Sequence, residues 1–123
     1  MLPNFLFPEQ TVRGNGEGPL LDVTDCPGSI IQLTLGITHI LEQESLDVAV
    51  FGSVNREEWG VKPLTTFPQK FYKGMYAILL DLSPTPDIRF LKVKYTMNRW
   101  GHWTSGPEFG FYVFAEPLSV TAG

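Results

Sequence analysis

The hexapeptide NRWGHW, which ends at Trp103, gathers the side chains best suited to binding chemistry in this sequence. Trp100 and Trp103 could stack on sugar rings. Asn98, Arg99 and His102 could supply directional hydrogen bonds. The same residue types are enriched at the centres of protein–protein interfaces. In a third interpretation, Trp100 closes one end of the fold and Arg99 pairs with an acidic side chain. The residue types favour the last two interpretations over sugar binding.

The segment GSVNREEWG contains two adjacent carboxylates, Glu57 and Glu58. A glycoside hydrolase needs two carboxylates that face each other across a cleft, whereas adjacent side chains in extended or turn backbone point apart. We therefore predict a hairpin turn with Asn55 and Arg56 at its tip and both acids in solvent. Trp59 is predicted to fold the turn back over the protein.

Other residues with chemical potential are isolated in the sequence. Glu42 and Glu44 lie in a turn signal and are predicted to be solvated. His39 and His102 are far apart, so no spacing indicates a metal site. Nucleophilic catalysis would need the single cysteine, Cys26, to meet a histidine in space. We predict no catalytic residue, no metal site and no cofactor. A histidine held against a carboxylate in a cleft would be needed to argue for an enzyme.

The composition describes a chain with few charges and many aromatic rings. Its 123 residues suit one domain, and only 18% of them are charged while 13% are aromatic. Either the interior is large for the length, or apolar surface remains for a partner to cover. The net charge is −4 and no basic stripe is present, which argues against nucleic acid as a partner. Lys92 and Lys94 are predicted to form an ordinary solvated face.

The N-terminal sequence MLPNFLFPEQ lacks the basic start and the cleavage site of a signal peptide. No apolar run reaches the roughly 18 residues that a membrane helix needs. We predict no membrane association and synthesis in the cytoplasm. Incorporation into a virion or another assembly stays open.

Strand patterns dominate the chain. Apolar and polar residues alternate with the period of two that is typical of half-buried strands. These segments are residues 29–40, 45–51, 87–97 and 108–118, with shorter candidates at 19–23, 63–67 and 74–82. Clusters of glycine and proline separate them. The pattern predicts an all-β fold, a single antiparallel β-sandwich of jelly-roll or immunoglobulin-like type with about seven or eight strands.

The first 18 residues differ from the rest, so we divide the chain into an apolar arm with a glycine-rich hinge (1–18) and a sandwich domain (19–123). Phe5 and Phe7 could fold back as an edge strand of their own sandwich. Alternatively, they could dock on a neighbouring subunit, since termini are loose unless something holds them.

The last strand segment is aromatic on both faces. Tyr112 and Phe114 lie on the face opposite Phe109 and Phe111. A strand that is apolar on both sides needs cover on both sides. Tyr112 and Phe114 are therefore expected to be covered by a neighbouring subunit or by the chain's own arm.

Several short motifs resemble those of small β-sandwich proteins from phage structural gene regions and, more loosely, discoidin-like domains. The matching residues are Gly52, Ser53 and Trp59, then Leu64 and Phe67, then Arg89, Phe90, Leu91, Lys92 and Val93. Asn55 and Arg56 stand where the pattern has Asp-Gly, so the turn type differs. Discoidin domains are often closed by a disulfide, which a single cysteine forbids, and carbohydrate or lipid binding is not carried over. The phage-like resemblance implies a structural or assembly role and identifies no catalytic residue.

The function predicted from these observations is a non-enzymatic structural subunit that self-associates or decorates a larger particle or filament. Its expected partners are copies of itself or a larger protein assembly. Phe5, Phe7, Tyr112 and Phe114 are the candidate contacts, together with the Trp100 loop. The alternative is a carbohydrate-binding module that uses this loop to hold a glycan.

Overall fold

The computed structural model of the chain describes residues 2–101 and 105–118. These residues contain nine strands and no helix, so none of them forms a helix that could cross a membrane. The strands are β1 (Asn4–Val12), β2 (Gly16–Glu17), β3 (Leu21–Asp22), β4 (Ile30–Ile40), β5 (Glu44–Ser53), β6 (Thr65–Thr66), β7 (Gly74–Asp81), β8 (Phe90–Arg99) and β9 (Phe109–Pro117). The predicted all-β class is confirmed.

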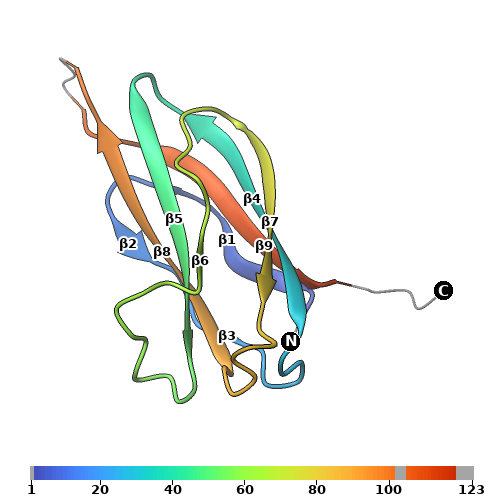
Figure 1. Cartoon of the computed structure of the whole chain (residues 1–123). Helices are drawn as coiled ribbons and strands as arrows, with labels where there is room; N and C mark the ends of the chain where they lie inside the picture. The colour runs from blue at the N-terminus through green and yellow to red at the C-terminus, as the bar shows by residue number, and fades with distance from the viewer. Residues whose placement is uncertain (1, 102–104, 119–123) are drawn as a thin grey trace.

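The strands form two antiparallel sheets that pack face to face (Figure 1). The four-stranded sheet has the order β1-β9-β4-β7. The five-stranded sheet has the order β2-β8-β5-β6, and β3 also pairs with β8. The predicted β-sandwich is therefore confirmed, with three strands of only two residues each.

The strand order distinguishes between the two predicted sandwich types. Because β2 and β3 both pair with β8, they act as one interrupted strand, which reduces nine strands to eight. When these eight strands are numbered in chain order, the sheet β1-β9-β4-β7 consists of strands 1, 8, 3 and 6. The second, seventh, fourth and fifth form the other. This alternation between sheets is the jelly-roll arrangement.

Alternating apolar residues of the long strands fill the space between the sheets, as their period of two requires. The buried set includes Ile31, Leu33, Leu35, Ile37, Leu46, Val48, Val50, Leu91, Val93, Phe109, Phe111 and Val113. The faces predicted for β4, β5, β8 and β9 agree with this core.

The N-terminal arm is part of the sandwich. β1 pairs with β9 of the same chain, and β2 pairs with β8. Phe7 is 1% exposed and stacks on Phe111 with ring centroids 4.5 Å apart. Register shifts on either side of Phe7 allow its neighbour Leu6 to be buried as well. Phe7 is thus a core residue, and the described part of residues 1–18 is continuous with the sandwich.

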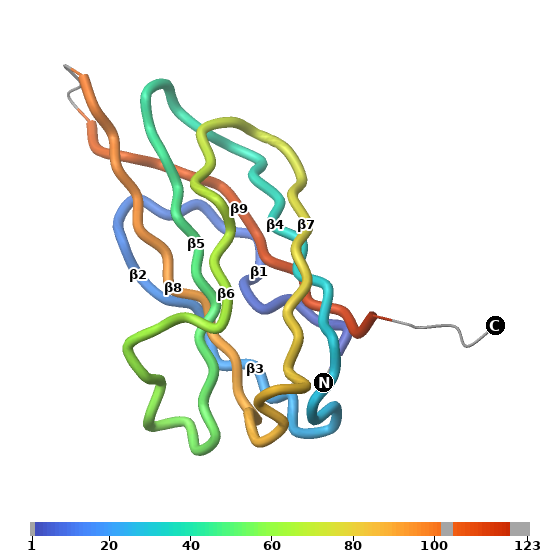
Figure 2. The backbone as a smooth tube through the Cα atoms, in the orientation of Figure 1, coloured from blue at the N-terminus to red at the C-terminus, as the bar shows by residue number. Residues whose placement is uncertain are grey.

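The segment GSVNREEWG begins where β5 ends and leads into the connection at residues 54–64, the green loop at the lower left of Figure 2. Asn55 Oδ1 accepts hydrogen bonds from the N–H groups of Glu57 (3.0 Å) and Glu58 (2.9 Å), and both acids are exposed as predicted. Arg56 has a φ of 73°, a left-handed conformation that is unusual for arginine.

Candidate functional site

The outer side of the four-stranded sheet carries apolar side chains at its centre and charged ones at its ends, and we call this surface the outer apolar face. The inward side chains of β4 and β9 define the core, so their alternate residues point outward. Strand register arranges these residues in rows across the sheet. One row is Phe5, Phe114, Thr34 and Ala77, and the next is Tyr112, Gly36 and Met75. Leu79 extends the face along β7.

Three aromatic residues of this face contact one another. The Phe5 ring lies 5.0 Å from the Phe114 ring and 5.8 Å from the Tyr112 ring, in edge-on geometry. Tyr112 lies directly over Gly36, where an added Cβ would approach the Tyr112 ring to 2.2 Å. The chain's own arm thus gives Tyr112 and Phe114 part of the cover they were expected to need.

The β7 side of the face has much less cover. Met75 is 72% exposed and Leu79 is 57% exposed, although both side chains are apolar. The 74–82 strand was predicted from the sequence, but the exposure of these two residues was not. The signal was present, because β7 is apolar at consecutive positions and its inner face is already occupied by Ile78 and Leu80.

The outer side of the five-stranded sheet is built differently. Its aromatic rings are covered by cations: Arg56 lies over Phe90 at 4.7 Å, Lys92 over Trp59 at 4.3 Å and Lys94 over Phe51 at 4.6 Å.

The prediction that Lys92 and Lys94 form an ordinary solvated face is wrong, since the Lys92 side chain is only 13% exposed. The reason is that their ammonium groups lie over the Trp59 and Phe51 rings. Trp59 folds back over β8 as predicted, and its Nε1–H also donates to the Arg56 carbonyl oxygen (2.8 Å).

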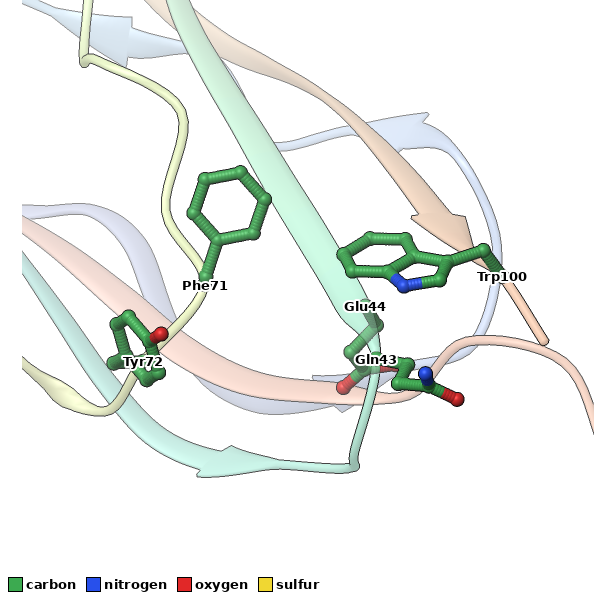
Figure 3. Close-up of a pocket in the computed structure, with 5 residues that line it drawn as sticks. All are labelled: Gln43, Glu44, Phe71, Tyr72 and Trp100. Carbon is green, nitrogen blue, oxygen red and sulfur yellow. The ribbon is translucent and has the colours of Figure 1, made fainter.

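A hollow of about 240 Å³ lies near the end of β8 and is lined by Gln43, Glu44, Phe71, Tyr72 and Trp100 (Figure 3). Phe71 and Tyr72 come from the connection between β6 and β7. The Phe71 and Trp100 rings meet edge-on with centroids 6.1 Å apart. Sequence reasoning identified Trp100 but missed the other aromatic side chains, because they are distant in the chain.

Arg99 braces the loop that follows β8. Its guanidinium group donates to the carbonyl oxygens of Glu42 (3.1 Å) and Ser105 (3.2 Å) and to the Ser105 hydroxyl (3.0 Å). These contacts hold the loop against the β4–β5 turn. The predicted contacts His102 and Trp103 lie outside the described residues.

Glu44 corrects the prediction that both acids of the β4–β5 turn are solvated. Its side chain is 1% exposed, and its two carboxylate oxygens accept the backbone N–H groups of Leu41 (2.7 Å) and Glu108 (2.8 Å). A buried carboxylate with two such bonds is well satisfied. Glu44 therefore ties the β4–β5 turn to the start of β9. It also lines the hollow, but its carboxylate is already engaged by these two hydrogen bonds.

A charged cluster joins β1, β4 and β9 at the same end of the four-stranded sheet. Glu108 accepts hydrogen bonds from Arg13 Nε (2.8 Å) and pairs with His39 Nε2 (2.7 Å). The hydrogen bonds from His39 and then Arg13 lower the pKa of Glu108 below its ordinary value of 4.5. A histidine does meet a carboxylate here, but neither residue lines the hollow beside Trp100. The cluster gives the strand ends a structural tie.

The remaining candidates for catalysis are the Cys26 thiol and a metal site, and the described residues support neither. The Cys26 thiol lies 3.6 Å from the Val23 carbonyl oxygen, and burial, with Asp25 nearby, raises its pKa and so disfavours the reactive thiolate. In residues 2–101 and 105–118, no three His, Cys, Asp or Glu side chains gather closely enough to hold a metal ion.

Comparison with models of protein families and with curated proteins finds no match to the chain. The resemblance to phage structural proteins therefore stays a prediction. Its motif residues act in packing: a Cβ at Gly52 would meet Leu64 at 2.5 Å, Phe67 is buried, and Trp59 covers β8.

Proposed function

We infer that this chain is a non-enzymatic structural subunit that works by self-association or by attachment to a larger assembly such as a particle or filament. The observation that carries the proposal is the outer apolar face. Small apolar patches are common on monomeric proteins, whereas large ones mark interaction sites. Phe5 covers the β9 side of this face, but Met75 and Leu79 are left bare.

The fold agrees with this role but does not decide it. Jelly rolls occur in viral capsid proteins and also in lectins, and one fold supports many functions. The low share of charged residues and the resemblance to phage structural proteins both favour the assembly role.

Light scattering coupled to size-exclusion chromatography tests the proposal on the full chain. We expect a particle mass above the 13.8 kDa of one chain, rising with concentration. Met75→Gln and Leu79→Gln should shift the mass towards the monomer. Val61→Gln is the matched control, because Val61 is 95% exposed in the loop that borders the other sheet. A mass of one chain at every concentration would overturn self-association.

A carbohydrate-binding role is the second candidate, and the hollow beside Trp100 favours it. Three aromatic side chains and Gln43 line this hollow, and sugar sites combine such rings with hydrogen-bonding groups. Retention on immobilised glycans should fall for Trp100→Ala and Phe71→Ala and persist for the control Trp59→Ala. Unchanged retention in the first two variants would exclude this role.

A further inference from the structure

The two edge strands of the four-stranded sheet differ in how well they are protected from pairing with other chains. β1 contains Pro8 and two register shifts, and both devices disrupt an edge. β7 has neither: its register with β4 runs without interruption from Asp81 to Gly74. It contains no proline and no lysine, and it is eight residues long. An apolar strand of this kind is a template for another strand.

The hydrogen-bonding pattern shows which backbone groups face the open edge of β7. The Leu82 N–H donates to the Ser29 carbonyl oxygen of the β4 side at 2.9 Å. Because antiparallel residues alternate in direction, the even-numbered residues of β7 point their backbone groups at β4. Met75, Ala77 and Leu79 therefore direct theirs outward. Among the described residues, β7 pairs with no strand except β4.

The exposed side chains around β7 would match those of a second β7 strand that runs antiparallel to it. Lys73, Met75, Ala77, Leu79 and Asp81 occupy alternate positions and are all exposed. Met75 and Leu79 each lie two residues from Ala77, on opposite sides of it. Lys73 and Asp81 each lie four residues from Ala77. Neither charged residue forms an ion pair within the described part of the chain. Asp81 Oδ1 accepts one hydrogen bond from the Ser83 N–H, and the carboxylate can accept more.

We propose that two copies of this chain join edge to edge through antiparallel pairing of their β7 strands, with a two-fold axis at Ala77. Met75 of each copy then lies opposite Leu79 of the other, and Lys73 lies opposite Asp81. Every backbone group that faces the open edge meets a partner in this register. The two four-stranded sheets become one continuous sheet, and their outer apolar faces merge.

Neighbouring registers are less favourable. An axis at Tyr76 would place Lys73 opposite Leu79, and an axis at Ile78 would place Met75 opposite Asp81. An axis between two residues would set edge-facing backbone groups against groups that point away. Only the Ala77 register pairs apolar with apolar and opposite charge with opposite charge.

This inference rests on the proposed self-association. Exchanging the charges at positions 73 and 81 tests the register. Lys73→Asp alone places two acids opposite each other, and Asp81→Lys alone places two lysines there, so each variant should dimerise about tenfold more weakly. An equimolar mixture of the two variants should recover the wild-type affinity, because the mixed dimer restores both ion pairs. The double variant Lys73→Asp/Asp81→Lys should recover it too. Analytical ultracentrifugation gives these affinities, and thermal melts show that each variant is folded.

Disulfide trapping supplies a second measurement that does not depend on charge. In a Cys26→Ser background, Ala77→Cys should form a covalent dimer on mild oxidation, because paired Cα atoms lie about 5.5 Å apart. Met75→Cys should not cross-link to itself, since the two copies of residue 75 would be about 13 Å apart. It should cross-link when mixed with Leu79→Cys.

The outcomes separate this inference from the proposed function. If the wild-type chain is monomeric at all concentrations, both this inference and self-association fail, and only attachment to a different assembly remains of the proposed function. If it assembles but the mixture recovers no affinity and Ala77→Cys does not cross-link, the β7 register is wrong and self-association stands. Assembly that survives every β7 variant but is lost in Phe114→Ser would assign the contact to face-to-face packing instead.

Discussion

The aromatic rings on the outer faces of the two sheets are covered in different ways. Both sheets carry aromatic rings on the side away from the core. On the five-stranded sheet, Arg56, Lys92 and Lys94 lie over the rings, and the loop that carries Trp59 folds down on them. On the four-stranded sheet, the cover comes instead from Phe5 of the chain's own arm.

The difference indicates which side of the sandwich is complete within one chain. A cation over a ring is attracted to the ring face and covers that apolar surface. The outer rings of the five-stranded sheet are therefore covered within the chain. The charged groups of the four-stranded sheet lie at its margins instead, as in the cluster of Arg13, His39 and Glu108. We propose that its apolar centre is the surface that another molecule covers.

Gly36→Ala should produce the largest effect on the outer apolar face. The new Cβ would lie 2.2 Å from the Tyr112 ring, so the ring must move away and its packing against Phe5 is lost. We expect a loss of about 1–3 kcal/mol in the free energy of unfolding, measured by urea titration. Gly14→Ala is the control, because nothing lies within 4 Å of its added Cβ. Equal stability of the two variants would show that Tyr112 packing on the sheet contributes little.

Trp59→Ala tests the opposite face. It removes the ring beneath Lys92 and the hydrogen bond to Arg56, which together should cost about 1–2 kcal/mol in the free energy of unfolding. Self-association should be unchanged, because this side is covered within the chain. Light scattering that shows altered assembly in a folded Trp59→Ala protein would contradict the division between the two faces.

Arg56 offers a finer test, since two opposing effects meet at one residue. Arg56→Ala keeps the unfavourable φ of 73° and loses the contact with Phe90, so it should destabilise the protein by about 0.5–1 kcal/mol. Arg56→Gly loses the same contact but relieves the backbone cost of about 1 kcal/mol. Chemical denaturation should therefore rank glycine above alanine at this position. The reverse order would show that the left-handed backbone carries little strain.

The smallest effect concerns the charged margin of the four-stranded sheet. Folding lowers the pKa of Glu108, so its stabilising contribution is present above the ordinary value of 4.5 and is lost as pH falls through the lower folded-state value. Wild type should melt at a higher temperature than Glu108→Gln at neutral pH, and the gap should close on acidification below 4.5. A gap that stays constant with pH would show that the carboxylate charge is not responsible.

Strand alternation was sufficient to predict the sandwich. The faces of β4, β5, β8 and β9 follow from a period of two, which depends only on local backbone geometry. Trp59 was also predicted correctly as a packing residue. The two errors, Glu44 and the lysine pair, share a cause. Whether a polar side chain is buried depends on groups that are distant in sequence, namely the Glu108 N–H for Glu44 and the Trp59 and Phe51 rings for Lys92 and Lys94.

The hollow beside Trp100 illustrates the same limit. Trp100 stood out in the sequence as a rare, large side chain in a loop. Phe71 and Tyr72 join it only because the β6–β7 connection crosses from one sheet to the other beside the end of β8.

By itself, the sequence determined the all-β class, the β-sandwich and the core faces of the long strands. These properties follow from residue type and local periodicity. Tertiary structure decided that β1 pairs with β9 and that Tyr112 lies on Gly36. It also placed cations over the outer rings of the five-stranded sheet and, among the described residues, left β7 paired with β4 alone. Those features depend on which strands become neighbours, and strand neighbours are set by packing across the whole chain.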